Sequence, residues 1–149
     1  MIIYTTMTDR RDADFMRIFR RTLEEHADEC PTVRQLARLA VQKPAPQFYV
    51  SYGYARRVLR ERRKNLRSRC KGRCAEQLWL TLENAVRKLE KRHGIAADEA
   101  LQRVLADSAA PSFFISPATA IRIYWKSIAP SRRHSALKKQ VANKNRSAQ

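Results

Sequence analysis

The residues best suited to chemistry in this 149-residue sequence are the arginines and lysines that follow Ala55. Between Arg56 and Ala75 there are ten basic residues and a single acidic one, Glu61, for a net charge of +9. Eight of the ten are arginine, whose planar guanidinium can form two hydrogen bonds with a phosphate or a guanine. Charge concentrated in this way repels itself and is most simply explained by a polyanionic partner. We therefore expect the ligand to be a nucleic acid.

A helix starting after Ser51 and continuing through Leu66 would place many of these cations along one face, because Ser51 is a favourable N-cap residue. The basic stripe, as we call the cations at three- to four-residue spacing, is Arg56, Arg60, Arg63, Lys64 and Arg67. Tyr52 and Tyr54 in the first turn are expected either to contact bases or sugars or to pack at the helix start. The complete expected nucleic-acid site is Tyr52, Tyr54, Arg56, Arg57, Arg60, Arg63, Lys64, Arg67, Arg69, Lys71 and Arg73.

The rest of the formal charge of +17 is unevenly placed as well. Residues 1–55 and 76–125 are close to neutral, whereas residues 126–149 carry seven basic residues and no acidic ones. The polar end of the chain lacks hydrophobic periodicity, so we expect a disordered basic tail that acts as an electrostatic arm. A surface selected for solubility would also account for the charge, as would a contact with a membrane. The membrane contact is disfavoured because the basic run lacks a bulky apolar opposite face.

Two segments match at a fixed offset of 65 residues, which predicts an internal tandem repeat. Residues 45–51, APQFYVS, correspond to residues 110–116, APSFFIS. The correspondence continues on both sides at the same spacing, with Leu36, Ala55 and Arg57 matching Leu101, Ala120 and Arg122.

Each copy is expected to form three helices. In the first copy, apolar residues at helical spacing from Phe15 predict one helix, with Asp12 or Asp14 as its cap. Thr32 is suited to cap the second helix, prolines that follow it end that helix, and Ser51 caps the third. These patterns predict an all-α protein of two repeated three-helix units packed as a small helical bundle.

The second copy carries its own end signals. Gly94 suits the left-handed position after a helix, and Ser116 followed by proline is typical of a helix start. Aromatic residues lie between the second and third helices of both copies and are expected to be core anchors more than base-stacking residues: Phe48, Tyr49, Phe113 and Phe114. The expected organisation is a first unit over residues 1–69, a basic linker at 70–75, a second unit over 76–129 and the tail at 130–149.

Residues 32–40, TVRQLARLA, resemble the first helix of a helix-turn-helix, and residues 51–59, SYGYARRVL, resemble its recognition helix. The resemblance implies a DNA-binding unit whose second helix enters the major groove. Helix-turn-helix units join these helices by about three to four residues, whereas residues 41–50 separate them here. The second copy offers fewer residues suited to reading bases.

Histidine and cysteine residues supply one alternative, a zinc site. His26 and Cys30 are four residues apart, as are Cys70 and Cys74, and residues at this spacing share a helix face. The four could ligate zinc and link the first helix to the basic run. Structural zinc ligands more often flank a short turn, so we expect neither a metal nor any other cofactor.

No catalytic constellation is evident, because the three glycines are isolated and no histidine has an acidic pair at recognisable spacing. We expect a non-enzymatic nucleic-acid-binding protein, regulatory or architectural, with DNA favoured over RNA. The alternatives are an RNA-binding protein and a protein-interaction module whose basic segments dock an acidic partner. Residues 1–6 do not resemble a signal peptide and no run is apolar enough to span a membrane, so we expect a soluble, cytoplasmic protein without a membrane partner.

Overall fold

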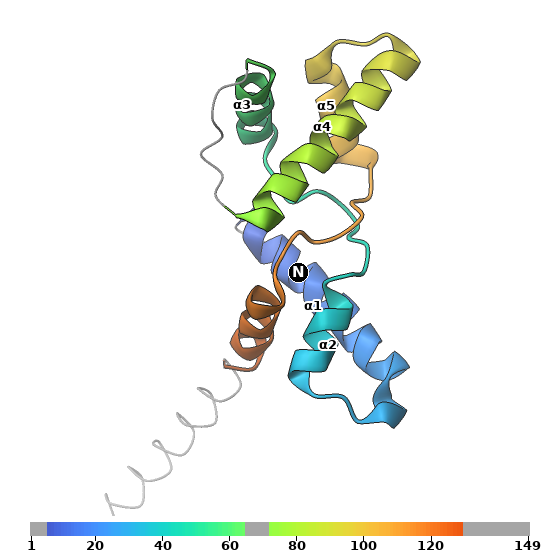
Figure 1. Cartoon of the computed structure of the whole chain (residues 1–149), viewed down its shortest axis with the longest axis vertical. Coiled ribbons are helices and arrows are strands. Elements are labelled where there is room, and N and C mark those ends of the chain that lie inside the picture. The colour runs from blue at the N-terminus through green and yellow to red at the C-terminus, as the bar shows by residue number, and fades with distance from the viewer. Residues whose placement is uncertain (1–5, 65–71, 130–149) are drawn as a thin grey trace, which may run out of the picture.

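The computed structural model describes residues 6–64 and 72–129, and every regular element within these ranges is a helix (Figure 1). The elements are α1 (Met7–Glu25), the short 3-10 helix η1 (Ala27–Glu29), α2 (Val33–Ala40), α3 (Tyr52–Arg63), α4 (Arg73–His93), α5 (Ala97–Asp107) and a last helical stretch over residues 117–129. The all-α prediction is confirmed for this part of the chain. The tail at 130–149, expected to be disordered, lies outside the described residues.

Side-chain caps start three of the described helices where the sequence predicts them. Thr32 and Gln35 form a reciprocal capping box at the start of α2, with hydrogen bonds of 3.2 and 2.9 Å. Ser51 accepts the backbone N–H of Tyr54 at the start of α3. Ser116 does the same for the helix over residues 117–129. Each bond satisfies one of the N–H groups that a helix start leaves without an intrahelical acceptor.

The expected cap of α1 is wrong. Thr6 caps α1, accepting the Asp9 N–H at 3.1 Å, so neither Asp12 nor Asp14 is the cap. The apolar spacing located the buried face of α1 but not its start, because the first turns are polar and exposed. α3 ends at Arg63, and the expected continuation through Leu66 lies outside the described ranges.

The third helix of each half of the chain packs against the other half. Figure 1 shows α3 beside α4 and α5 at one end of the molecule, and residues 117–129 near α1 and α2 at the other. The linkers to these helices meet in the middle, where Ala45 and Ala110 exchange two backbone hydrogen bonds of 2.9 and 3.0 Å. Ala45 and Ala110 are separated by the same offset of 65 residues that relates the matching segments. This exchange, in which each third helix packs on the other half of the chain, was not predicted from the sequence.

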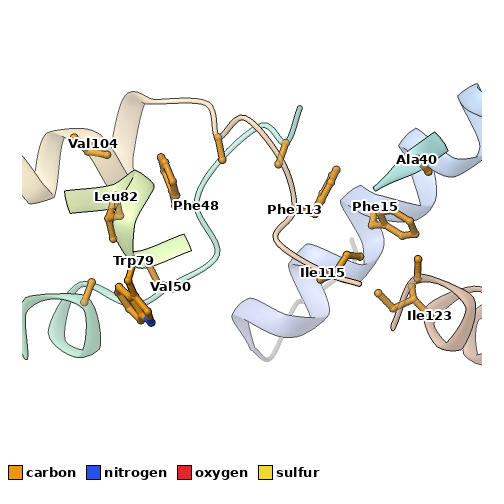
Figure 2. Close-up of a cluster of buried hydrophobic side chains, with 14 of the residues drawn as sticks. Phe15, Ala40, Phe48, Val50, Trp79, Leu82, Val104, Phe113, Ile115 and Ile123 are labelled. Carbon is orange, nitrogen blue, oxygen red and sulfur yellow. The ribbon is translucent and has the colours of Figure 1, made fainter. Parts of the chain in front are cut away.

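The buried apolar side chains belong to one core cluster, and those labelled in Figure 2 lie in two groups, one on each side of the crossing linkers. Phe48 and Val50 from the first linker extend toward α4 and α5, where the group is completed by Trp79, Leu82 and Val104. Phe113 and Ile115 from the second linker extend toward α1 and α2, where the group is completed by Phe15, Ala40 and Ile123. Each group therefore contains residues from both halves of the chain.

Aromatic rings hold the two linkers together. Phe48 stacks on Phe114 at 6.1 Å between ring centres, and Tyr49 stacks on Phe113 at 5.9 Å. Phe48 and Phe113 are buried and the other two rings pack against the core, so the prediction that these four residues are core anchors is confirmed. The Tyr49 hydroxyl also donates a 2.6 Å hydrogen bond to the Asp14 carboxylate. The pKa of Tyr49 is raised above its usual value, mainly by burial and to a smaller extent by this hydrogen bond.

Candidate nucleic-acid interface

The packing of α3 decides which of its cations face solvent. Ala55, Val58 and Leu59 are the buried residues of this helix, and they attach it to the half of the molecule that contains α4 and α5. Cations on the flanks of this buried face lie within reach of acidic residues on α4 and α5. As a result, several residues of the basic stripe form ion pairs within the protein.

Two members of the stripe share one carboxylate of α5. The Arg56 Nε donates to Asp98 Oδ2 at 3.1 Å, and an Arg60 terminal nitrogen donates to the same oxygen at 3.2 Å. The hydrogen bond from Arg56 lowers the pKa of Asp98 below its usual range, and the same bond raises the pKa of Arg56. Both arginines stay substantially exposed, at 41% and 57% of the side chain. The pairing therefore leaves part of each guanidinium in contact with water.

Arg62 is the most enclosed cation of α3. Its Nε donates to Glu83 Oε2 at 2.8 Å, and its Nη1 donates to Glu76 Oε1 at 3.1 Å, both on α4. Only 15% of the Arg62 side chain is exposed, and the Glu83 hydrogen bond is the main cause that raises its pKa. Arg63, a member of the stripe, also binds α4 through Glu90.

Arg62 is not among the residues of the expected site, and its acidic partners were not predicted from the sequence. One signal was present: Arg62 follows the buried Val58 by four residues and Leu59 by three, so all three lie on the same face of α3. The partners themselves lie 14 and 21 residues farther along the chain, beyond any helical spacing. Only the packing of α3 on α4 brings them together.

Arg57 of α3 and Lys64, the residue that caps its C-terminal end, are exposed and form no ion pair with a described acidic residue. The Arg57 guanidinium lies over the Tyr54 ring, 5.2 Å from its centre, and Tyr54 meets Trp79 edge-on at 5.6 Å. Tyr54 remains 43% exposed. Tyr52 instead packs against the core. The two tyrosines of the first turn thus differ, with Tyr54 on the surface and Tyr52 partly buried.

A shallow surface hollow of about 220 Å³ runs along this side of α3. It is lined by Gly53, Arg56, Arg57, Arg60, Glu61 and Lys64, and we call it the α3 hollow. Four basic side chains against one carboxylate leave it positively charged, even with Asp98 bound to two of the arginines. Such a site is suited to the phosphates of a nucleic acid, which contact arginine and lysine through charge-assisted hydrogen bonds.

Three residues of the expected site, Arg67, Arg69 and Lys71, lie outside the described ranges. Arg73 is the first residue of α4 and is exposed.

Cys70, one of the four residues of the zinc alternative, also lies outside the described ranges. Of the other three, His26 approaches Glu29 at 3.2 Å, Cys30 is exposed and Cys74 is partly buried. Within residues 6–64 and 72–129, no three histidine, cysteine or acidic side chains come together as a metal site.

The two helices that resemble a helix-turn-helix lie at opposite ends of the molecule (Figure 1). α2 packs against α1, while α3 packs against α5. In a helix-turn-helix the two helices are joined by a tight turn and lie against each other. The long linker and the exchange of third helices separate them here.

No protein-family model matches this chain, and searches of curated proteins and of solved structures found no match either. Among the helices of the described residues, none combines the length and the apolar composition needed to cross a membrane.

Proposed function

We propose that this protein is a non-enzymatic nucleic-acid-binding protein, regulatory or architectural, with duplex DNA as the favoured ligand. The contact is made by the α3 hollow and by the basic run that follows it toward α4. The observation that carries the proposal is the lining of the α3 hollow, where four cations face one carboxylate. The other six of the ten basic residues between Arg56 and Ala75 extend this positive charge along the chain.

Arg57 and Lys64 have the leading role in this proposal. Both side chains are exposed, and within the described residues neither is held by a carboxylate, so each can meet a phosphate without first breaking an ion pair. The Tyr54 ring holds the Arg57 guanidinium in place through a cation–π contact. Arg56 and Arg60 have two roles in this proposal. They form ion pairs that join α3 to Asp98 of α5, and they line the α3 hollow.

The test is binding of a fluorescent DNA duplex at several salt concentrations. The variant with Arg57→Gln and Lys64→Gln should bind more weakly, and the slope of log affinity against log salt should fall by about 2 if each side chain contacts one phosphate. The matched control replaces Lys88 and Lys91, which are exposed on α4, with glutamine. It removes the same formal charge and should leave the salt slope nearly unchanged.

Equal losses in the two double variants would show that the affinity follows net charge alone and would overturn the assignment of the α3 hollow. Absence of any duplex binding at low salt would overturn the proposed function itself. Running the same titration with an RNA duplex and with an acidic polypeptide distinguishes the preferred ligand class. Tighter binding of either competitor than of DNA would overturn the preference for DNA.

A further inference from the structure

The helix over residues 117–129 carries a second cationic surface, and its cations are arranged differently from those of α3. Residues 117–129 include Arg122 and Lys126 and no acidic residue. Both cations are exposed, and neither forms an ion pair with an acidic residue of the described chain. Beside them Trp125 is 47% exposed, with its ring edge-on to that of Tyr124 at 5.2 Å between ring centres.

These three side chains follow one another around the helix. At about 100° per residue, Arg122 lies roughly 60° from Trp125 around the axis and Lys126 roughly 100° from it, in the same direction. Ile123, which is buried, lies farther round on the same side. We call Trp125, Arg122 and Lys126 the Trp125 face.

A groove of about 460 Å³ adjoins the Trp125 face, between this helix and α1. Its apolar lining comes from Ala13, Met16 and Ile123, and Lys126 belongs both to the groove and to the face. Arg17 and Arg20 add positive charge from α1, with Arg17 bound to Asp14 at 2.6 Å. Two carboxylates, Asp9 and Asp12, also line the groove, and Asp12 is bound by Arg11 at 3.0 Å.

We propose that the Trp125 face and this groove bind a single-stranded segment of nucleic acid. One base stacks on Trp125, phosphates of the strand contact Arg122 and Lys126, and a base farther along the strand lies over the apolar lining formed by Met16 and Ile123. The inference deepens the proposed function and rests on it, because it assigns a second contact to the same class of ligand. It also makes the two contacts different, with phosphate contacts at the α3 hollow and base stacking here.

The combination of residues selects a single strand over a duplex. An aromatic ring stacks on a base only where the base is not already stacked on both sides, as in single strands, loops and ends. Single-strand binders pair such rings with a positively charged groove that follows the backbone. The groove volume is within the range of sites that hold small organic groups, which suits a nucleobase.

The experiment compares binding of an oligothymidine, an oligouridine and a DNA duplex to the full chain. Trp125→Ala should weaken binding of the single strands at least about fivefold, the loss expected for one stacked base, and leave duplex binding unchanged within about twofold. Trp125→Phe keeps a stacking ring and should retain most of the single-strand affinity. The matched control is Leu80→Ala, which removes an apolar side chain that is 51% exposed on α4.

Tryptophan fluorescence gives a second readout in the same titration. Trp79 is buried in the other apolar group, so quenching by a bound single strand should come from Trp125 and disappear in Trp125→Phe. Single-strand affinity that is unchanged in Trp125→Ala would overturn this inference while leaving the proposed function standing. A loss that is equal for single strand and duplex would overturn it too. Failure of every nucleic acid to bind at low salt would overturn both.

Discussion

Arg62 and Arg57 lie five positions apart in the same basic run, and the structure predicts opposite consequences for replacing them. Arg62→Met removes the guanidinium that joins α3 to Glu83 and Glu76 of α4, while it keeps most of the aliphatic volume. Arg57→Met removes a cation that is exposed and rests on a tyrosine ring. We expect the first change to reduce stability and the second to reduce nucleic-acid binding.

The size of the stability loss depends on how exposed the Arg62–Glu83 ion pair is and on which partners Glu83 keeps after the substitution. Breaking a fully buried ion pair costs about 3 to 5 kcal/mol, and breaking an exposed one costs about 0 to 1 kcal/mol. Arg62 and Glu83 are each 15% exposed, which places this pair nearer the first limit. Glu83 keeps a second partner, Arg87, at 2.7 Å, so the substitution does not leave a bare carboxylate. We therefore expect a loss of about 2 kcal/mol in the free energy of unfolding for Arg62→Met.

Urea denaturation followed by circular dichroism measures this loss. With a typical dependence of about 1 to 2 kcal/mol per molar urea, the midpoint should fall by about 1 to 2 M in Arg62→Met. Arg57→Met should stay within about 0.5 kcal/mol of the parent protein, as surface substitutions usually do. Combining Arg62→Met with Glu83→Gln should cost less than the sum of the two single changes, since both remove the same contact. A loss in Arg62→Met no larger than that in Arg57→Met would refute the structural role of Arg62.

Three further predictions concern pH and cooperativity. Burial and Asp14 raise the pKa of Tyr49 in the folded protein. The neutral Tyr49 hydroxyl therefore contributes to the stability of the fold below about pH 10, and this contribution is lost as the pH rises further. Tyr49→Phe should flatten the decline of the thermal midpoint between about pH 9 and 11. The hydrogen bond that lowers the pKa of Asp98 stabilises the protein above about pH 4 and is lost at lower pH; denaturation curves of the parent and Asp98→Asn should therefore converge on acidification. In Trp125→Phe the remaining Trp79 should report the same urea midpoint as circular dichroism, because both apolar groups contain residues from both halves of the chain; two separate midpoints would contradict this coupling.

Local signals in the sequence predicted the elements that local interactions determine. Thr32, Ser51 and Ser116 mark helix starts because a hydroxyl three residues before an N–H can bond to it without any help from the rest of the fold. Gly94 takes a left-handed conformation, with φ of 61°, at the end of α4. These features depend on neighbours within one turn and can therefore be recognised without the tertiary structure.

The exchange of third helices was not predictable in the same way. An amphipathic face specifies that a helix packs on something apolar, but not on which of two similar partners. Residues 41–51 are long enough, at up to about 3.3 to 3.6 Å per residue, to deliver α3 to either half. Ala45 and Ala110 meet at the crossing and occupy matching positions of the two segments related by the 65-residue offset. The ion pairs of α3 were not predictable for the same reason, because they depend on which half of the chain α3 packs against.

The two exchanged helices differ in how many of their basic side chains form ion pairs within the protein, and this difference affects how the charge excess of the sequence is interpreted. α3 contains the denser run of arginines, but most of its described arginines are bound to α4 or α5, where they hold the helix in place. The helix over residues 117–129 attaches through apolar and aromatic contacts, such as Tyr124 with Phe19 at 5.1 Å, and leaves Arg122 and Lys126 in solvent. Charge density along the sequence therefore does not show how many cations of each helix are free of an acidic partner within the described residues. A mutational search guided by charge density alone would begin with Arg62 and Arg63, where we expect loss of stability to obscure any effect on binding.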